Sequence, residues 1–134
     1  MKAVVAGWAA GYLMALITTA TMAVWVARGG GSRLADRLGS DAPWIAVALA
    51  GSLGAVFAWT IVGLLVAIVY VAGGFGAEPG LGSPSWPFTV GVCAAALSTA
   101  PVLLAFPRAL PVWLAHVAAF VGLFGWALPH LAGR

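Results

Sequence analysis

Apolar residues fill four long stretches of the chain, and polar or turn-forming residues gather between them. Each stretch is long enough to cross a bilayer as a helix, which takes about 20 residues at a rise of about 1.5 Å per residue. The stretches do not alternate between apolar and polar positions, so barrel strands are not indicated. The pattern predicts four transmembrane helices, over residues 3–27, 44–72, 87–106 and 110–128.

The connections between these predicted helices differ in composition. The first, from Arg28 to Asp41, contains a glycine run and most of the chain's charges. The second, from Gly73 to Trp86, is rich in Gly and Pro and has Glu78 as its one charged residue. The third is the short link 107–109. The first apolar run exceeds the core of a signal peptide, about 7–15 residues, so we interpret it as a retained helix.

The composition of the chain indicates that these helices are embedded in lipid. Charged residues make up 7% of the chain and hydrophobic residues 63%, whereas a soluble domain has about 25% charged residues. Six basic residues spread over 134 form no basic face, so we expect no nucleic-acid partner. We predict an all-α integral membrane protein, with residues 1–134 forming one transmembrane domain and the lipid bilayer as its first partner.

Basic residues predict the orientation of this domain, because short cytoplasmic loops carry an excess of Lys and Arg. Lys2 and Arg134 lie at the end of the bundle that holds both termini. Four arginines belong to the opposite end and are the expected determinants of topology: Arg28, Arg33, Arg37 and Arg108. We therefore expect a multi-pass protein of the inner (plasma) membrane with both termini outside.

A weak internal similarity offers two interpretations of the four helices. Residues 11–20 align with 91–100 at an offset of 80, and Arg28 then meets Arg108. In one interpretation the chain is two parallel-repeated helical hairpins, related by an axis along the membrane normal. In the other the match is accidental, because the second and fourth helices align less well.

Small residues mark two candidate packing faces. Gly7 and Gly11 form a GxxxG motif in the first helix, and Ala50, Gly54 and Ala58 repeat every four residues in the second. Such stripes let helix backbones approach closely, which favours association in lipid. They predict either docking of another subunit, including a second copy of the chain, or packing within the bundle itself.

Hydroxyl side chains cluster on the first and third helices. Thr18 and Thr19 lie on the first, and Ser98 and Thr99 lie on the third beside Pro101, which is expected to kink it. One hypothesis is that they line a polar path through the membrane. The other is that each hydroxyl bonds a carbonyl one turn back in its own helix.

Two histidines and one tryptophan are the candidate cofactor-binding residues. His116 and His130 lie on the fourth helix, about 40° apart around a regular helix and about 21 Å apart in height. This interval would suit ligation of haem b, or His116 could anchor a quinone, but no second helix supplies a histidine. Trp59 lies in mid-membrane, where its N–H needs a partner.

These observations favour a small non-catalytic accessory subunit of a larger membrane complex, plausibly a respiratory or photosynthetic electron-transfer assembly. We find no nucleophile–base set, no paired cysteines and no metal-ligand spacing, so we expect no enzyme, no catalytic residue and no metal site. The sequence alone predicts no cofactor. Two alternatives stay open: a homo-oligomeric channel or transporter lined by Thr and Ser, and a haem- or quinone-anchoring subunit that uses His116.

Overall fold

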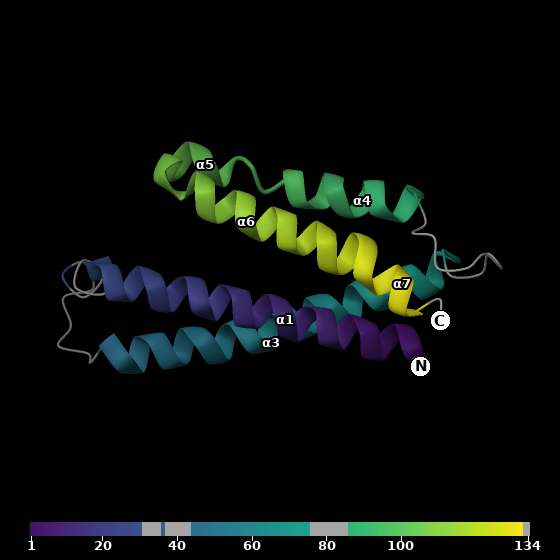
Figure 1. Ribbon diagram of the computed structural model, residues 1–134, viewed down its shortest axis with the longest axis horizontal. Coiled ribbons are helices and arrows are strands. Elements are labelled where there is room, and N and C mark those ends of the chain that lie inside the picture. Colours follow the sequence, from purple (N-terminus) through teal and green to yellow (C-terminus); the bar gives the residue numbers. More distant parts are fainter. Residues whose placement is uncertain (31–35, 37–43, 76–85, 133–134) are drawn as a thin grey trace.

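The computed structural model describes residues 1–30, 36, 44–75 and 86–132. The chain runs along the long axis of the bundle four times, and we call each of these passes a crossing (Figure 1). The crossings are α1 (Lys2–Trp25) with η1 (Val26–Gly30); α3 (Trp44–Ala72); α4 (Trp86–Leu97) with α5 (Val102–Ala105); and η2 (Pro107–Ala109) with α6 (Leu110–Phe120), η3 (Val121–Ala127) and α7 (Leu128–Ala132).

Four of these helical stretches are long and apolar enough to span a membrane, which confirms the predicted all-α four-helix fold. Successive crossings run in opposite directions, so both termini lie at one end of the bundle (Figure 1). The elements that carry Arg28 and Arg108, η1 and η2, lie at the other end. We call these the terminal end and the arginine end.

The third crossing is not the continuous helix predicted over 87–106, and this expectation was wrong in detail. Helix α4 ends at Leu97, and a series of tight turns leads to α5. Pro101 has no N–H to give to the carbonyl of Leu97, which instead accepts the N–H of Ala100 at 2.9 Å. The kink expected at Pro101 is therefore a full interruption of the helix.

The fourth crossing tolerates a proline by a different means. Pro129 cannot donate to the carbonyl of Gly125, four residues earlier, and the wider π-helical stretch η3 precedes it. The hydroxyl of Thr89, on α4, donates to that carbonyl at 2.8 Å. A neighbouring helix thus gives this carbonyl a donor that the proline cannot supply, and backbone groups in lipid need such partners.

The first two crossings pack backbone to backbone. Gly7 and Gly11 of α1 face Gly63 of α3, and a Cβ added to Gly63 would overlap the carbonyl oxygen of Gly7. A Cβ on Gly7 would also lie 2.6 Å from the Cβ of Ala67. Only hydrogen at these positions permits such an approach, so the pairing of α1 with α3 depends on the glycines.

Burial is confined to one half of the bundle. Every buried residue that the structure describes lies in 6–15, 63–70, 88–96 or 124–129. These segments share the terminal end, and we call this region the closed half. The segments on the arginine side, 16–28, 46–62 and 97–123, contain no buried residue; we call this region the open half.

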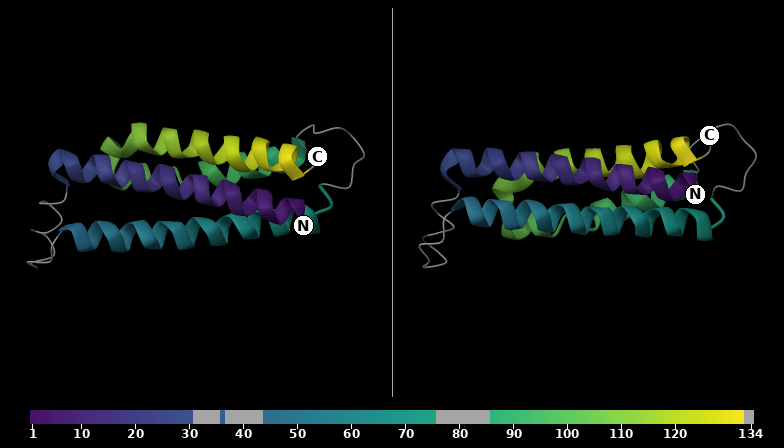
Figure 2. Two further views of the ribbon diagram at one scale, coloured as in Figure 1. Left: turned by 60° about the horizontal axis from the view of Figure 1, so that its bottom comes forward. Right: turned by 90° about the horizontal axis from the view of Figure 1, so that it is seen from below.

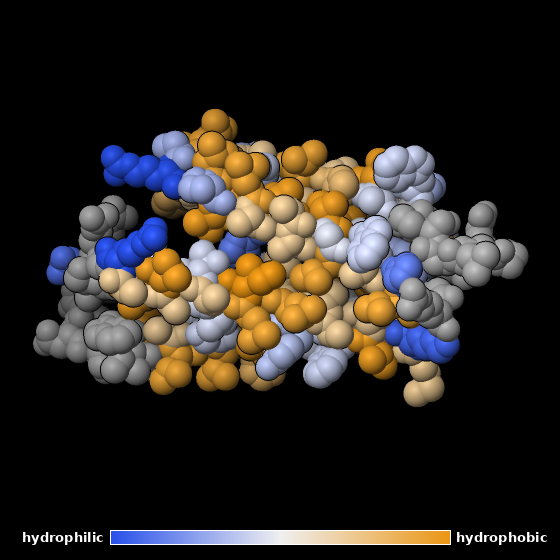
Figure 3. Space-filling view, viewed as in Figure 1, coloured by the Kyte–Doolittle hydropathy of each residue, from blue (hydrophilic) through white to orange (hydrophobic). Residues whose placement is uncertain are grey.

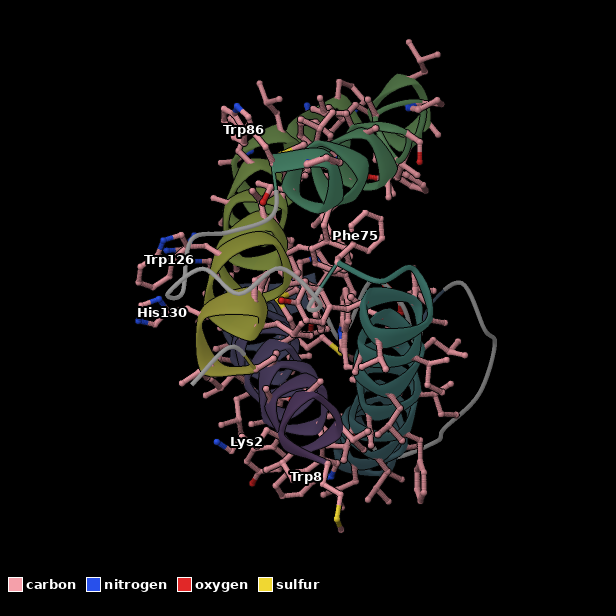
Figure 4. All side chains as sticks on the ribbon, turned by 90° about the vertical axis from the view of Figure 1, so that its right-hand side faces the viewer. Lys2, Trp8, Phe75, Trp86, Trp126 and His130 are labelled. Atoms are coloured by element: carbon pink, nitrogen blue, oxygen red, sulfur yellow. The ribbon has the colours of Figure 1, made fainter. Side chains whose placement is uncertain are left out.

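Aromatic rings fill the closed half. Tyr70 of α3 meets Phe88 of α4 edge-on at 5.0 Å between ring centroids, and Phe75 lies 5.4 Å from the same ring. Figure 4 shows Phe75 pointing into the space between α3 and α4. The side chains of Met14, Phe124 and Leu128 have no exposed surface at all. The closed half is therefore a packed core in which four crossings take part.

The helices separate toward the arginine end. Figure 2 shows α1 and α3 diverging there, and Figure 1 shows α6 leaving α1 as it approaches α5. The face shown in Figure 3 is largely apolar, and all four crossings expose large hydrophobic side chains. Lipid covers such side chains without cost, so what separates the two halves is how much of their interiors is buried.

Candidate functional site

Thr18 is the centre of a hydrogen-bonded cluster that joins three crossings. The indole N–H of Trp59, on α3, donates to Thr18 Oγ1 at 2.8 Å. The Nε2 atom of His116, on α6, lies 3.3 Å from the same oxygen. We call Thr18, Trp59 and His116 the polar triad. Sequence reasoning singled out each of these residues separately, and the structure brings them together.

The glycine packing of the first hairpin explains why Trp59 reaches Thr18. Trp59 lies one turn before Gly63 on α3, and its own backbone carbonyl oxygen lies against Gly11 of α1. This close approach carries the indole across the face of α1 to Thr18, two turns further along. The Trp59 ring then packs on Phe120 of α6, with 6.0 Å between ring centroids, which holds the fourth crossing in place beside the first two.

The partners fix the direction of most hydrogen bonds in the triad. Thr18 Oγ1 lies 2.9 Å from the carbonyl of Met14, and His116 Nδ1 lies 2.9 Å from the carbonyl of Val112. A carbonyl only accepts, so His116 carries a proton on Nδ1, and an indole N–H only donates. The contact between Thr18 and His116 Nε2 is the one whose direction depends on protonation.

The triad lies where the closed half meets the open half. Thr18 follows the fully buried Met14 by one turn, and all three members of the triad are half-buried. His116 lies eight residues from Arg108, a rise of about 12 Å along the helix. The surface is hollowed between α1 and the α5–α6 segment on the arginine side (Figure 3). Thr18 and His116 lie on the two helices that flank this hollow.

Thr99 forms a second, separate cluster in the open half. Its hydroxyl donates to the carbonyl of Ala96 at 2.6 Å and accepts the indole N–H of Trp113 at 2.9 Å. Ser98 is exposed and donates to the carbonyl of Ala95 at 2.6 Å. These bonds stay within the second hairpin.

The predicted polar path is thus divided into two groups of hydroxyls. Thr18 bonds within the triad, and Thr19 is half-buried beside it on α1. Ser98 and Thr99 occupy the interruption of the third crossing and bond to α4 and α6. Among the described residues, no hydrogen bond connects the two groups.

His130 lies apart from His116 in both position and contacts. Its ring stacks on Trp126 at 5.3 Å with an interplanar angle of 6°. Both side chains point away from the bundle in Figure 4, as do Lys2, Trp8 and Trp86. The π-helical stretch between the histidines changes the phase of the helix, so the regular 100° step that placed them on one face does not hold here.

Haem or quinone binding at His116 would require a rearrangement of the triad. Nδ1 is committed to the Val112 carbonyl, and Nε2 is in contact with Thr18. A metal ligand or quinone donor needs one nitrogen free. Across residues 1–30, 36, 44–75 and 86–132 there is no group of three His, Cys, Asp or Glu side chains that could hold a metal ion.

The two predicted small-residue stripes occupy opposite kinds of surface. Gly7 and Gly11 are buried against α3. Ala50, Gly54 and Ala58 are exposed on α3, and a Cβ added to Gly54 would meet nothing within 4 Å. The first stripe therefore works inside the bundle, and the second faces outward from the open half.

The described arginines lie on the surface of the arginine end. Arg28 and Arg108 are exposed, as is Asp36. Arg33 and Arg37 lie outside the described residues.

Three contributing residues were not singled out from the sequence. Gly63 and Ala67 complete the glycine packing; their four-residue spacing makes them candidates, but the same spacing recurs at Ala50, Gly54 and Ala58 of that helix. Thr89 supports the Gly125 carbonyl; the proline four residues after Gly125 was the clue that this carbonyl would need an outside donor.

Comparisons with protein-family models, with curated proteins and with solved structures found no match. The functional argument therefore rests on the chemistry and packing of the chain.

Proposed function

We propose that the protein is a non-catalytic accessory subunit of a larger membrane complex, completed in its open half by a helix of another subunit. The observation that carries this proposal is the distribution of burial. Four crossings close a core over residues 6–15, 63–70, 88–96 and 124–129, whereas 16–28, 46–62 and 97–123 bury nothing. A partner helix in the open half would supply the contacts that the chain does not make for itself.

The exposed stripe on α3 supports this location for the partner. Ala50, Gly54 and Ala58 lie in the open half, and the space beside Gly54 is empty within 4 Å. In lipid, helix association depends on close van der Waals packing, which small residues allow. The same chain uses this device internally, where Gly7 and Gly11 meet Gly63.

The state of the polar groups supports a structural role. No buried side-chain nitrogen or oxygen in the described part of the chain lacks a hydrogen-bond partner. Thr18, Trp59 and Thr89 use their polar atoms to join one crossing to another. Polar side chains that bond one helix to another stabilise the fold, which is what a structural subunit requires.

The test compares two leucine substitutions at glycines that both face open space, Gly54 on α3 and Gly91 on α4. Native mass spectrometry of the complex released from its own membrane should show the chain bound to at least one different chain. Gly54→Leu should lower the bound fraction at least tenfold, while Gly91→Leu should leave it unchanged. A wild-type chain that is released alone, or only as a homo-oligomer, would contradict the proposal.

We further propose that the arginine end faces the cytoplasm and both termini face outward across the inner membrane. Arg28 and Arg108 lie at that end, and Lys2 lies at the other. Orientation follows the loops with more basic residues. A Lys2→Cys variant in a Cys93→Ala background should react with a membrane-impermeant maleimide in intact cells; labelling only after lysis would reverse the assignment.

A further inference from the structure

The hydroxyl of Thr18 has more partners than one protonation state of His116 satisfies. Three groups surround Thr18 Oγ1: the Met14 carbonyl at 2.9 Å, the Trp59 indole N–H at 2.8 Å and His116 Nε2 at 3.3 Å. A hydroxyl donates one hydrogen bond and accepts two. It can bond all three groups at once only if His116 Nε2 is a donor.

His116 Nδ1 already carries a proton, because it bonds the Val112 carbonyl at 2.9 Å. A proton on Nε2 as well makes the ring an imidazolium. In that state Thr18 donates to Met14, accepts from Trp59 and accepts from His116, and every contact is a hydrogen bond.

In the neutral ring, Nε2 holds a lone pair and can only accept. The Thr18 hydrogen must then turn from the Met14 carbonyl to Nε2. The Met14 carbonyl keeps its place in the backbone bonds of α1, so this loss is small. Both states therefore fit the same positions of the heavy atoms, and they differ in which way the Thr18 hydroxyl points.

We propose that His116, on the α6 side of the arginine-side hollow, is a proton-binding site, and that the Thr18 hydroxyl reverses its hydrogen bond when the proton binds. A hydronium ion at the arginine end gives its proton to the Nε2 lone pair and leaves as water, so one O–H bond breaks and one N–H bond forms. Histidine is the side chain suited to this exchange near neutral pH. The proton changes the charge of the triad while α6 stays bonded to α1.

The hydrogen-bond partners of His116 are not themselves titratable. Within the described chain His116 hydrogen-bonds to Thr18 and Val112 and to no titratable group. The charged or titratable side chains on the described elements around it, and at the arginine end, are Lys2, Tyr12, Arg28, Asp36, Tyr70, Cys93, Arg108 and His130.

Protonation of His116 should be detectable at Trp59, because the Trp59 indole N–H and His116 Nε2 both contact Thr18 Oγ1. When Thr18 accepts a bond from a charged ring, the oxygen becomes a poorer acceptor for the indole N–H. Trp113, bonded to Thr99 in the second cluster, provides an internal control.

The experiment is nitrogen-15 NMR of the full chain in lipid nanodiscs, with labelled histidine and tryptophan, between about pH 8 and pH 5. We expect the His116 Nε2 signal to change from an unprotonated to a protonated nitrogen, and the Trp59 N–H signal to shift with the same midpoint. In Thr18→Ser, which keeps the hydroxyl, the Trp59 shift should persist. In Thr18→Val it should fall to the size seen for Trp113.

A His116 ring whose Nε2 stays unprotonated over this range would overturn the proposal. So would a full Trp59 shift in Thr18→Val. If Thr18→Val does not fold, His116→Gln serves the same purpose: the Trp59 shift must vanish, and its persistence would equally reject the coupling.

Discussion

The closed and open halves are built from the same four crossings and the same kinds of residue, yet only one of them has a core. In the closed half, glycines bring α1 and α3 to backbone contact, and aromatic rings fill the space toward α4 and α7. In the open half, α6 moves away from α1, and the third crossing is interrupted at Pro101 (Figure 1).

The difference shows what holds helices together where water is absent. Apolar side chains gain nothing by leaving lipid for one another, so close packing and hydrogen bonds decide which helices associate. The closed half has both, through Gly63 and through the Thr89 bond to Gly125. The open half has hydrogen bonds in the triad and at Thr99, and Met22 of α1 packs against Gly51 of α3, but none of its described residues is buried.

The largest effect should come from breaking the close packing of the closed half. Gly63→Leu forces a side chain into the carbonyl oxygen of Gly7, and overpacking against backbone should lower the free energy of unfolding by about 3 kcal/mol or more. Titration with SDS, followed by helix content, measures this loss.

Gly54→Leu is the matched control for that measurement, because its added side chain meets nothing within 4 Å in the chain. It should leave the unfolding midpoint of the isolated chain unchanged. Equal damage from the two substitutions would abolish the distinction between an inner and an outer face of α3.

The second-largest loss in the free energy of unfolding should come from a substitution at the boundary between the two halves. Thr18→Val keeps the shape of the side chain but leaves the Trp59 N–H and His116 Nε2 without their shared partner. We expect a loss of about 1–2 kcal/mol in the free energy of unfolding. The same SDS titration checks it, and Thr18→Ser should recover most of the loss. Full stability in Thr18→Val would mean that the triad does not hold the second hairpin to the first.

A smaller effect is expected where a hydroxyl replaces a missing backbone donor. Thr89→Val removes the bond to the Gly125 carbonyl and should cost about 1 kcal/mol. Pro129→Ala restores a backbone N–H four residues after Gly125, so the same Thr89 substitution should cost less in that background. A double-mutant cycle by SDS unfolding measures the difference, and strict additivity would reject the link.

The smallest effect belongs to the open half. Thr99→Val removes an exposed bond to Trp113 and should change the free energy of unfolding by about 0.5 kcal/mol or less. A cost as large as that of Thr18→Val would show that the second hairpin is held more firmly near Trp113 than its exposed contacts suggest.

The sequence predicted the crossings well because length and hydropathy alone determine them: α3 begins at Trp44 and ends at Ala72, as expected. The interruption near Pro101 was underestimated because proline effects in lipid depend on whether a neighbour satisfies the freed carbonyl. Pro129, with Thr89 nearby, is accommodated, whereas Pro101 ends a helix.

The candidate site could be predicted only as separate parts. The need of Trp59 for a partner was readable from its depth, but the identity of that partner depends on how α1 crosses α3. That crossing is set by Gly63 and Ala67, which periodicity does not distinguish from other small residues. The outward direction of the Ala50–Gly54–Ala58 stripe was hidden for the same reason.

The most direct test of the central claim is photo-crosslinking in the native membrane from two positions on the exposed surface of α3. Benzoylphenylalanine in place of the exposed Phe57, beside the Ala50–Gly54–Ala58 stripe, probes the open half, and in place of the exposed Leu65 it probes the closed half. The account predicts a crosslink from position 57 to one partner protein of defined mass, and lipid adducts alone from position 65. Lipid adducts alone from both positions would contradict it.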